Sequence, residues 1–141
     1  MKLQNRATIL YIIQLISVLG LVTSLYLTNA HLTGGSTACD ISPTVSCSFV
    51  NTSTFSEIFG IPVALLGMVW FVVLSYLGFK YFWKPKQYVK WLFWWSIVGI
   101  LSVVYLIWAE IILGAICLYC TFVHVLVLIT FGLVLYLRKK R

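Results

Sequence analysis

Four long apolar stretches divide this chain, and polar residues gather between them and at its two ends. A helix needs about 20 apolar residues to cross a bilayer, and each stretch has that length. Strands are shorter, so this pattern favours helices. It predicts an all-α membrane protein, a four-transmembrane-helix bundle forming a single domain over residues 1–141. The predicted spans are residues 7–27, 61–82, 91–113 and 115–137.

Composition supports a membrane location. Hydrophobic residues make up 62% of the chain and charged residues only 9%, too few to cover a water-soluble globule. Lys80 and Glu110 are the only charged residues within the predicted spans, and each lies near a span end. The first span resembles a signal peptide in its basic start, but its apolar stretch exceeds the usual 7–15 residues. We therefore expect it to be retained.

The charges indicate how the spans are oriented. The long loop 28–60 and the turn at Gly114 contain no Lys or Arg, whereas all three acidic residues fall on that side. By the positive-inside rule, both termini are cytoplasmic and the loop is extracytoplasmic. The net charge of +7 then reflects topology and contact with anionic lipids, and favours no nucleic-acid partner. The basic residues on the predicted cytoplasmic side are Lys2, Arg6, Lys80, Lys84, Lys86, Lys90 and Arg138 to Arg141.

All four cysteines fall on the predicted extracytoplasmic side. Cys39 and Cys47 lie in the loop, and Cys117 and Cys120 form a Cys-x-x-Cys motif at the start of the last span. This compartment permits disulfides, and four cysteines allow three pairings that spacing alone does not distinguish. A helix N-terminus favours the thiolate, so the motif indicates thiol–disulfide exchange. A structural zinc site or a purely structural disulfide remains an alternative.

Two further features lie close to the motif. His124 follows Cys120 by four residues, so both side chains share one helix face. It either hydrogen-bonds a bound quinone or is a neutral, buried histidine bonded to another helix. In the loop, hydroxyl residues 52–54 and the spacing of Phe55, Ile58 and Phe59 predict a short half-helix cap over Cys120. His31 is expected to be a solvated loop residue.

Together these segments resemble the vitamin K epoxide reductase family. The resemblance rests on a four-span plan and on the order of five segments: Cys39-Asp40, Cys47-Ser48, Ser53, residues 58–67 and residues 117–121. It extends from the first span to the last. In DsbB-type enzymes a Cys-x-x-Cys motif lies in the first external loop and precedes the second cysteine pair. In this chain the Cys-x-x-Cys motif comes after the other pair.

The resemblance implies roles for individual residues. Cys39 and Cys47 match the family's shuttle pair, and Cys117 and Cys120 its active-site pair, with Cys120 nearest the quinone. Residues implied or expected to contact the quinone are Ser53, Phe55, Ser56, Phe59 and His124. Ser56 occupies a position where animal members carry a substrate-binding asparagine, which argues against vitamin K epoxide as substrate. His124 falls where they commonly have a tyrosine that hydrogen-bonds the quinone, so a polar role is retained with a different residue type.

The implied function is a membrane thiol–disulfide oxidoreductase. Electrons would pass from a reduced thioredoxin-fold protein, similar to DsbA, through both cysteine pairs to a membrane quinone such as menaquinone, ubiquinone or vitamin K. This reaction supports disulfide formation in extracytoplasmic proteins, and no metal is expected. One alternative is reduction of vitamin K epoxide in an endoplasmic reticulum membrane. Another is a structural or metal-binding membrane module without enzymatic activity.

Overall fold

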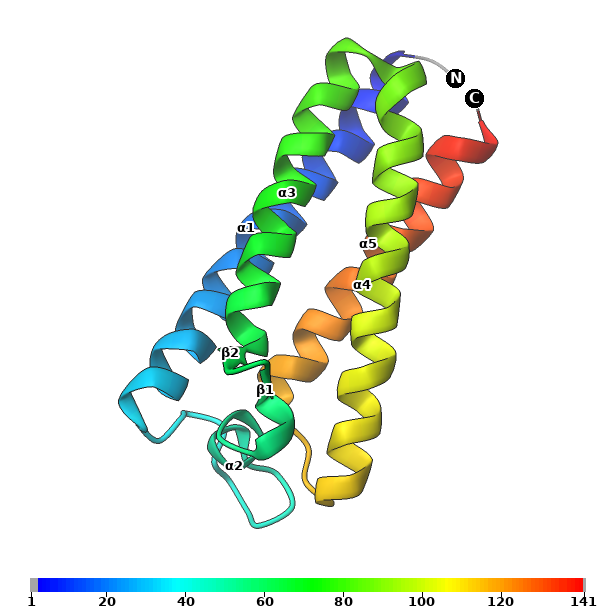
Figure 1. Ribbon diagram of the computed structural model, residues 1–141. Coiled ribbons are helices and arrows are strands. Elements are labelled where there is room, and N and C mark those ends of the chain that lie inside the picture. The colour runs from blue at the N-terminus through cyan, green and yellow to red at the C-terminus, as the bar shows by residue number, and fades with distance from the viewer. Residues whose placement is uncertain (1–2, 141) are drawn as a thin grey trace.

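Four long helices pack side by side in an up-and-down bundle (Figure 1). The computed structural model describes residues 3–140, so Lys2 and Arg141 of the charge pattern lie outside the described residues. Each long helix is apolar and long enough to cross a membrane, which confirms the predicted multi-pass bundle. The helices are α1 (Leu3–Thr33), α3 (Val63–Trp83), α4 (Pro85–Leu113) and α5 (Leu118–Lys139).

Two of these helices extend beyond the predicted spans. α1 continues to Thr33, so His31 lies in its last turn and the prediction of a loop residue was wrong. In this extension the Thr28 and Thr33 hydroxyls each donate to the carbonyl one turn back, at 2.7 and 2.8 Å, so neither side chain leaves its donor unpaired. α4 begins at Pro85, whose fixed φ suits the first helical position.

Close helix packing in the bundle core depends on aromatic side chains and glycines. The Phe71 ring fills the space beside Gly20, where a Cβ atom would come within 2.2 Å of the ring. Trp70 and Trp95 donate reciprocally to each other's backbone carbonyl, at 3.1 and 3.0 Å, and so join α3 to α4. Small residues and interhelical hydrogen bonds commonly stabilise membrane bundles in this way.

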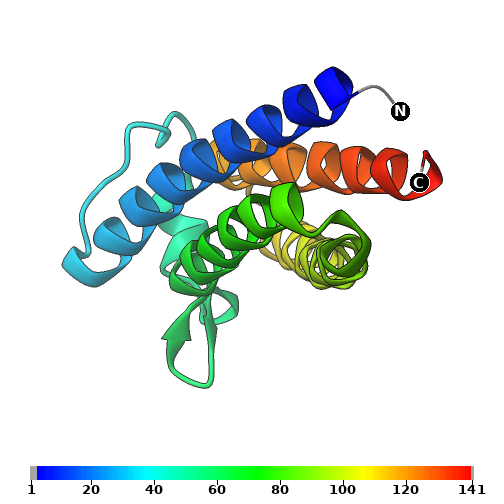
Figure 2. The same ribbon diagram turned by 90° about the horizontal axis from the view of Figure 1, so that it is seen from above.

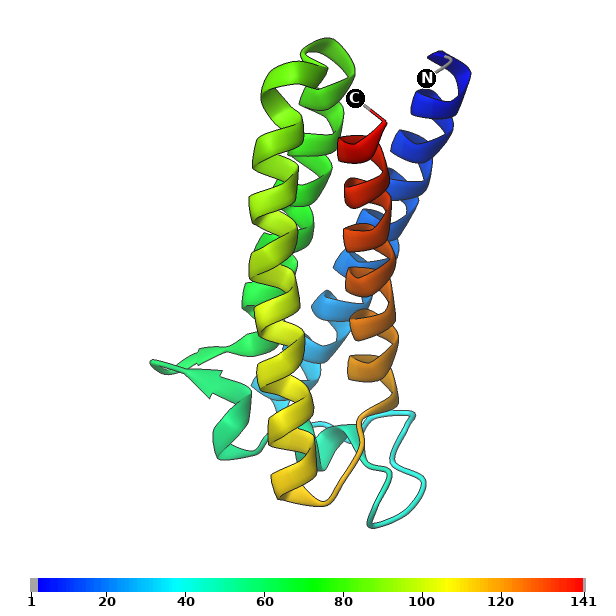
Figure 3. The same ribbon diagram turned by 90° about the vertical axis from the view of Figure 1, so that its right-hand side faces the viewer.

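A small cap covers one end of the bundle, and it differs from the predicted half-helix. It comprises helix α2 (Cys47–Asn51), the 3₁₀ turn η1 (Thr54–Ser56) and a hairpin of β1 (Glu57–Ile58) and β2 (Ile61–Pro62). Phe59 and Gly60 both have positive φ, as a tight two-residue hairpin turn requires. The hairpin projects from the bundle, as Figures 2 and 3 show. The Phe59 side chain is therefore fully exposed at its tip.

Candidate active site

The four cysteines lie together beneath the cap. Cys39 and Cys47 form a disulfide with their Cα atoms 5.7 Å apart, and Cys117 and Cys120 are free thiols. The sulfur atoms of Cys39, Cys47 and Cys117 all lie within 4.8 Å of one another. This proximity allows thiol–disulfide exchange between the loop and the Cys-x-x-Cys motif with only small movements.

Backbone pairing brings the two cysteine pairs together. The Ile116 N–H donates to the Thr44 carbonyl at 2.9 Å, and the Ser46 N–H donates to the Ile116 carbonyl at 3.2 Å. These bonds form a parallel bridge between Val45 and Ile116. Because Cys47 and Cys117 lie just beyond the bridged residues, they emerge side by side.

Asp40 organises the loop that carries the disulfide. Its carboxylate accepts hydrogen bonds from the Ser48 hydroxyl and N–H, the Ser46 hydroxyl and the Thr37 N–H. The bonds from Ser48, followed by those from Ser46 and Thr37, hold the pKa of Asp40 well below its usual range. The ionised carboxylate thus links both ends of the loop that closes at Cys39 and Cys47.

Cys117 is the N-cap of α5, and its sulfur accepts the Cys120 N–H at 3.2 Å. A hydrogen bond from the Cys120 side chain is the main cause of a lowered pKa of the Cys117 thiol, with smaller contributions from the N–H groups of Cys120 and Tyr119. Burial and the charge of Glu110 oppose this lowering of the pKa. Cys117 therefore ionises more readily than an ordinary cysteine and is suited to exchange with the adjacent disulfide.

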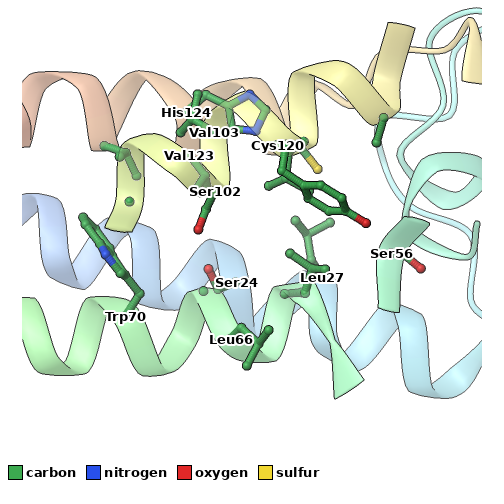
Figure 4. Close-up of a pocket in the computed structure, with 18 of the residues that line it drawn as sticks. Ser24, Leu27, Ser56, Leu66, Trp70, Ser102, Val103, Cys120, Val123 and His124 are labelled. Atoms are coloured by element: carbon green, nitrogen blue, oxygen red, sulfur yellow. The ribbon is translucent and has the colours of Figure 1, made fainter. Parts of the chain in front are cut away.

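A cavity of about 560 Å³ lies between the four long helices and the cap. Cys120 and His124 follow one wall, and Ser24, Leu27, Leu66 and Trp70 lie across from them (Figure 4). Cys117 is fully buried in the cluster around the disulfide. Of the two thiols, Cys120 is thus the one that meets the contents of this active-site cavity.

The cap closes the outer end of the cavity, and three of its predicted contact residues line it: Ser53, Phe55 and Ser56. Phe55 packs edge-on against Trp108, with ring centroids 5.6 Å apart. The Ser53 and Ser56 hydroxyls donate to backbone carbonyls at 2.7 and 2.6 Å, so their hydrogens are already engaged. Phe59, the fourth cap residue predicted to contact a ligand, is turned away from the cavity by the hairpin.

His124 supplies an unused polar atom to this apolar cavity. The side chain is 5% exposed, and its Nε2 atom has no hydrogen-bond partner among the residues that the structure describes. A buried nitrogen is normally paired, so an unpaired one on a side chain that lines the cavity indicates a missing partner. The structure thus shows no hydrogen bond from Nε2 to another helix within residues 3–140, and contact between His124 and a quinone stays a prediction.

Residues 11–135 match the vitamin K epoxide reductase family over most of the chain's length. The chain belongs to this family. No curated protein matches it significantly. As a member of the vitamin K epoxide reductase family, the protein is a quinone-reducing thiol–disulfide oxidoreductase.

The active-site cavity fits the quinone that the family uses. Small-molecule sites typically occupy about 300–1,000 Å³ and have apolar walls with few polar groups. The volume of about 560 Å³, the mainly apolar lining and the unpaired Nε2 of His124 meet this description.

Sequence reasoning missed several polar residues of the cavity wall, and three of them make hydrogen bonds that hold the site together. Glu110, interpreted only as a marker of topology, accepts the Cys117 N–H through its Oε1 atom at 3.3 Å. The Tyr105 hydroxyl donates to the Phe55 carbonyl at 3.1 Å and fastens the cap to α4. Asn51 donates to the Leu27 carbonyl at 2.8 Å. Glu110 alone had a sequence signal, since it is a carboxylate in an apolar span, seven residues before Cys117.

Proposed function

We propose that this protein passes electron pairs from a reduced extracytoplasmic thioredoxin-fold protein, similar to DsbA, to a membrane quinone and so supports disulfide formation. One observation carries the proposal. Cys117 lies within 4.8 Å of both sulfurs of the Cys39–Cys47 disulfide, and Cys120 lines the active-site cavity. The Cys-x-x-Cys motif thus connects the loop disulfide to a lipid-soluble acceptor. Both chain termini are cytoplasmic in this scheme.

The first transfer takes place at the loop. A partner thiolate attacks Cys39, which forms a mixed disulfide and releases Cys47 as a thiolate. The second partner thiol then displaces Cys39, so the partner leaves oxidised. Cys39 is only 4% exposed, and the loop that Asp40 holds must therefore open when the partner docks.

The second transfer joins the two pairs. The Cys47 thiolate attacks Cys117 of the Cys117–Cys120 disulfide and releases the Cys120 thiolate. Cys39 then attacks Cys47, which restores the loop disulfide and frees Cys117. The product has a Cys39–Cys47 disulfide and two thiols in the motif, the same oxidation state as the structure.

The third transfer takes place in the active-site cavity. The quinone accepts two electrons and two protons when bound. Cys120 faces the quinone. When Cys117 and Cys120 form their disulfide, the two thiols give up the two electrons and two protons that the quinone accepts. Rotation of the His124 side chain brings the buried Nε2 atom into the cavity, where it donates a hydrogen bond to a quinone oxygen. Glu110 holds the Cys117 backbone in place.

The test measures reduction of a menaquinone or ubiquinone analogue by purified protein given a reduced thioredoxin-fold partner. We expect Cys120→Ala to abolish quinone reduction with any electron donor. Cys39→Ala should abolish reduction with the protein partner, whereas dithiothreitol, small enough to reduce the motif directly, should restore it. Full activity of Cys120→Ala, or failure of dithiothreitol to rescue Cys39→Ala, would contradict the proposed route.

A further inference from the structure

The turn between α3 and α4 lies at the opposite end of the bundle from the cap (Figure 1). Residues at this turn line a second cavity, of about 460 Å³. Three chain segments contribute to it: the start of α1, the end of α3 and the first turn of α4. We call it the cationic cavity. Its lining residues are Arg6, Tyr81, Lys84, Pro85, Lys86 and Gln87.

The positive charges of the cationic cavity have no acidic side chain near them among the described residues. The chain has three acidic side chains, Asp40, Glu57 and Glu110, and all lie toward the other end of the bundle. Other cations near this end rest on aromatic rings: Lys80 on Tyr76, Arg138 on Phe93 and Lys140 on Tyr136. An anion that neutralises the cavity must therefore come from outside the described residues.

Arg6 provides an independent sign of an absent ligand. Its Nε atom is buried, yet it has no hydrogen-bond partner among residues 3–140. A guanidinium group binds phosphate through two parallel N–H donors, of which Nε–H is commonly one. The same cavity receives the first turn of α4, a 29-residue helix whose N-cap Lys84 forms no side-chain cap. Because Pro85 has no N–H group and the Gln87 N–H donates to the Lys84 carbonyl, this helix end favours an anion mainly through the helix dipole.

We propose that the cationic cavity binds a phosphate group, held by Arg6 and Lys86 at the start of α4. The lipid headgroup of an anionic phospholipid is one source of this group, and free phosphate is the other. The cavity lies at an end of four membrane-spanning helices, where lipid phosphates are concentrated. This site is separate from the active-site cavity and does not depend on the redox function.

The test compares lipids carried by the full-length protein. The wild type and three variants are exchanged into bilayers containing phosphatidylglycerol or only phosphatidylcholine, and retained lipid is counted by native mass spectrometry. Arg6→Gln and Lys86→Gln should each retain about tenfold less phosphatidylglycerol, the typical effect of losing one hydrogen bond to a charged group. Lys90→Gln is the matched control, because it removes the same charge from the same helix outside the cavity, and it should retain lipid like the wild type.

Inorganic phosphate distinguishes the two sources. If millimolar phosphate raises the Tm of the lipid-depleted wild type but not of Lys86→Gln, while lipid retention is unselective, the site binds free phosphate. Selective retention of phosphatidylglycerol without a phosphate effect identifies the lipid headgroup. Lys86 is exposed, so its substitution leaves the fold intact even if Arg6→Gln destabilises α1. Equal retention of both lipids with no effect of phosphate, or an equal loss in Lys90→Gln, would overturn the proposal.

Discussion

Substituting His124 separates a ligand-binding role from a structural one, because the two roles predict opposite changes in stability. His124→Leu removes the imidazole and leaves an apolar side chain of comparable bulk. In the folded protein the buried Nε2 has no partner among the described residues. An unsatisfied buried polar group costs about 1–3 kcal/mol. The free energy of unfolding of His124→Leu should therefore equal or exceed that of the wild type.

Activity should change in the other direction. In the proposed mechanism the Nε2–H group bonds a quinone oxygen on which negative charge develops. Losing one such donor in an apolar site costs about 1–3 kcal/mol of transition-state stabilisation. This corresponds to a fall of about 5–150-fold in kcat/KM for the quinone. Transfer between Cys47 and Cys117 does not involve the imidazole and should keep its rate.

The assay has three parts: quinone reduction driven by dithiothreitol, stopped-flow exchange between the loop and the motif, and thermal unfolding in detergent. His124→Gln, which keeps an N–H donor on a side chain of similar reach, is the matched control and should recover part of the activity. If His124→Leu lowers Tm and activity together, the histidine is structural. If its kcat/KM stays within about twofold of the wild type, the hydrogen bond to the quinone does not exist.

Two other predictions concern the cysteine geometry. A variant that keeps only Cys47 and Cys117 should form the disulfide between them on mild oxidation, because their sulfurs lie within 4.8 Å; peptide mapping under non-reducing conditions detects it. The complementary variant, which keeps only Cys39 and Cys120, should not form a disulfide. Equal disulfide yields in the two variants would refute the proposed alignment of Cys47 with Cys117. Glu110→Gln removes a negative charge that raises the pKa of the Cys117 thiol, so that pKa should fall. Alkylation of Cys117 should then reach half its maximal rate at a lower pH than in the wild type, and an unchanged or higher midpoint would show that Glu110 exerts no such charge effect.

Local pattern predicted the cap poorly. The spacing of Phe55, Ile58 and Phe59 suits one face of a helix, but such short apolar spacing also occurs in turns and hairpins. Contacts with α4 decide the outcome, since Phe55 packs on Trp108 and its carbonyl accepts from Tyr105. These partners lie about 50 residues further along the chain. No window of the sequence around the cap contains them.

The sequence alone determined the membrane bundle, the number of its spans and the placement of all four cysteines toward one end. Those properties follow from the length of each apolar stretch and the position of each residue relative to its ends, which are local. Only the tertiary structure decided that Cys47 meets Cys117 and that Nε2 of His124 lacks a partner among the described residues. These depend on atoms from segments far apart in the chain, whose relative positions are set by packing and by the bridge between Val45 and Ile116.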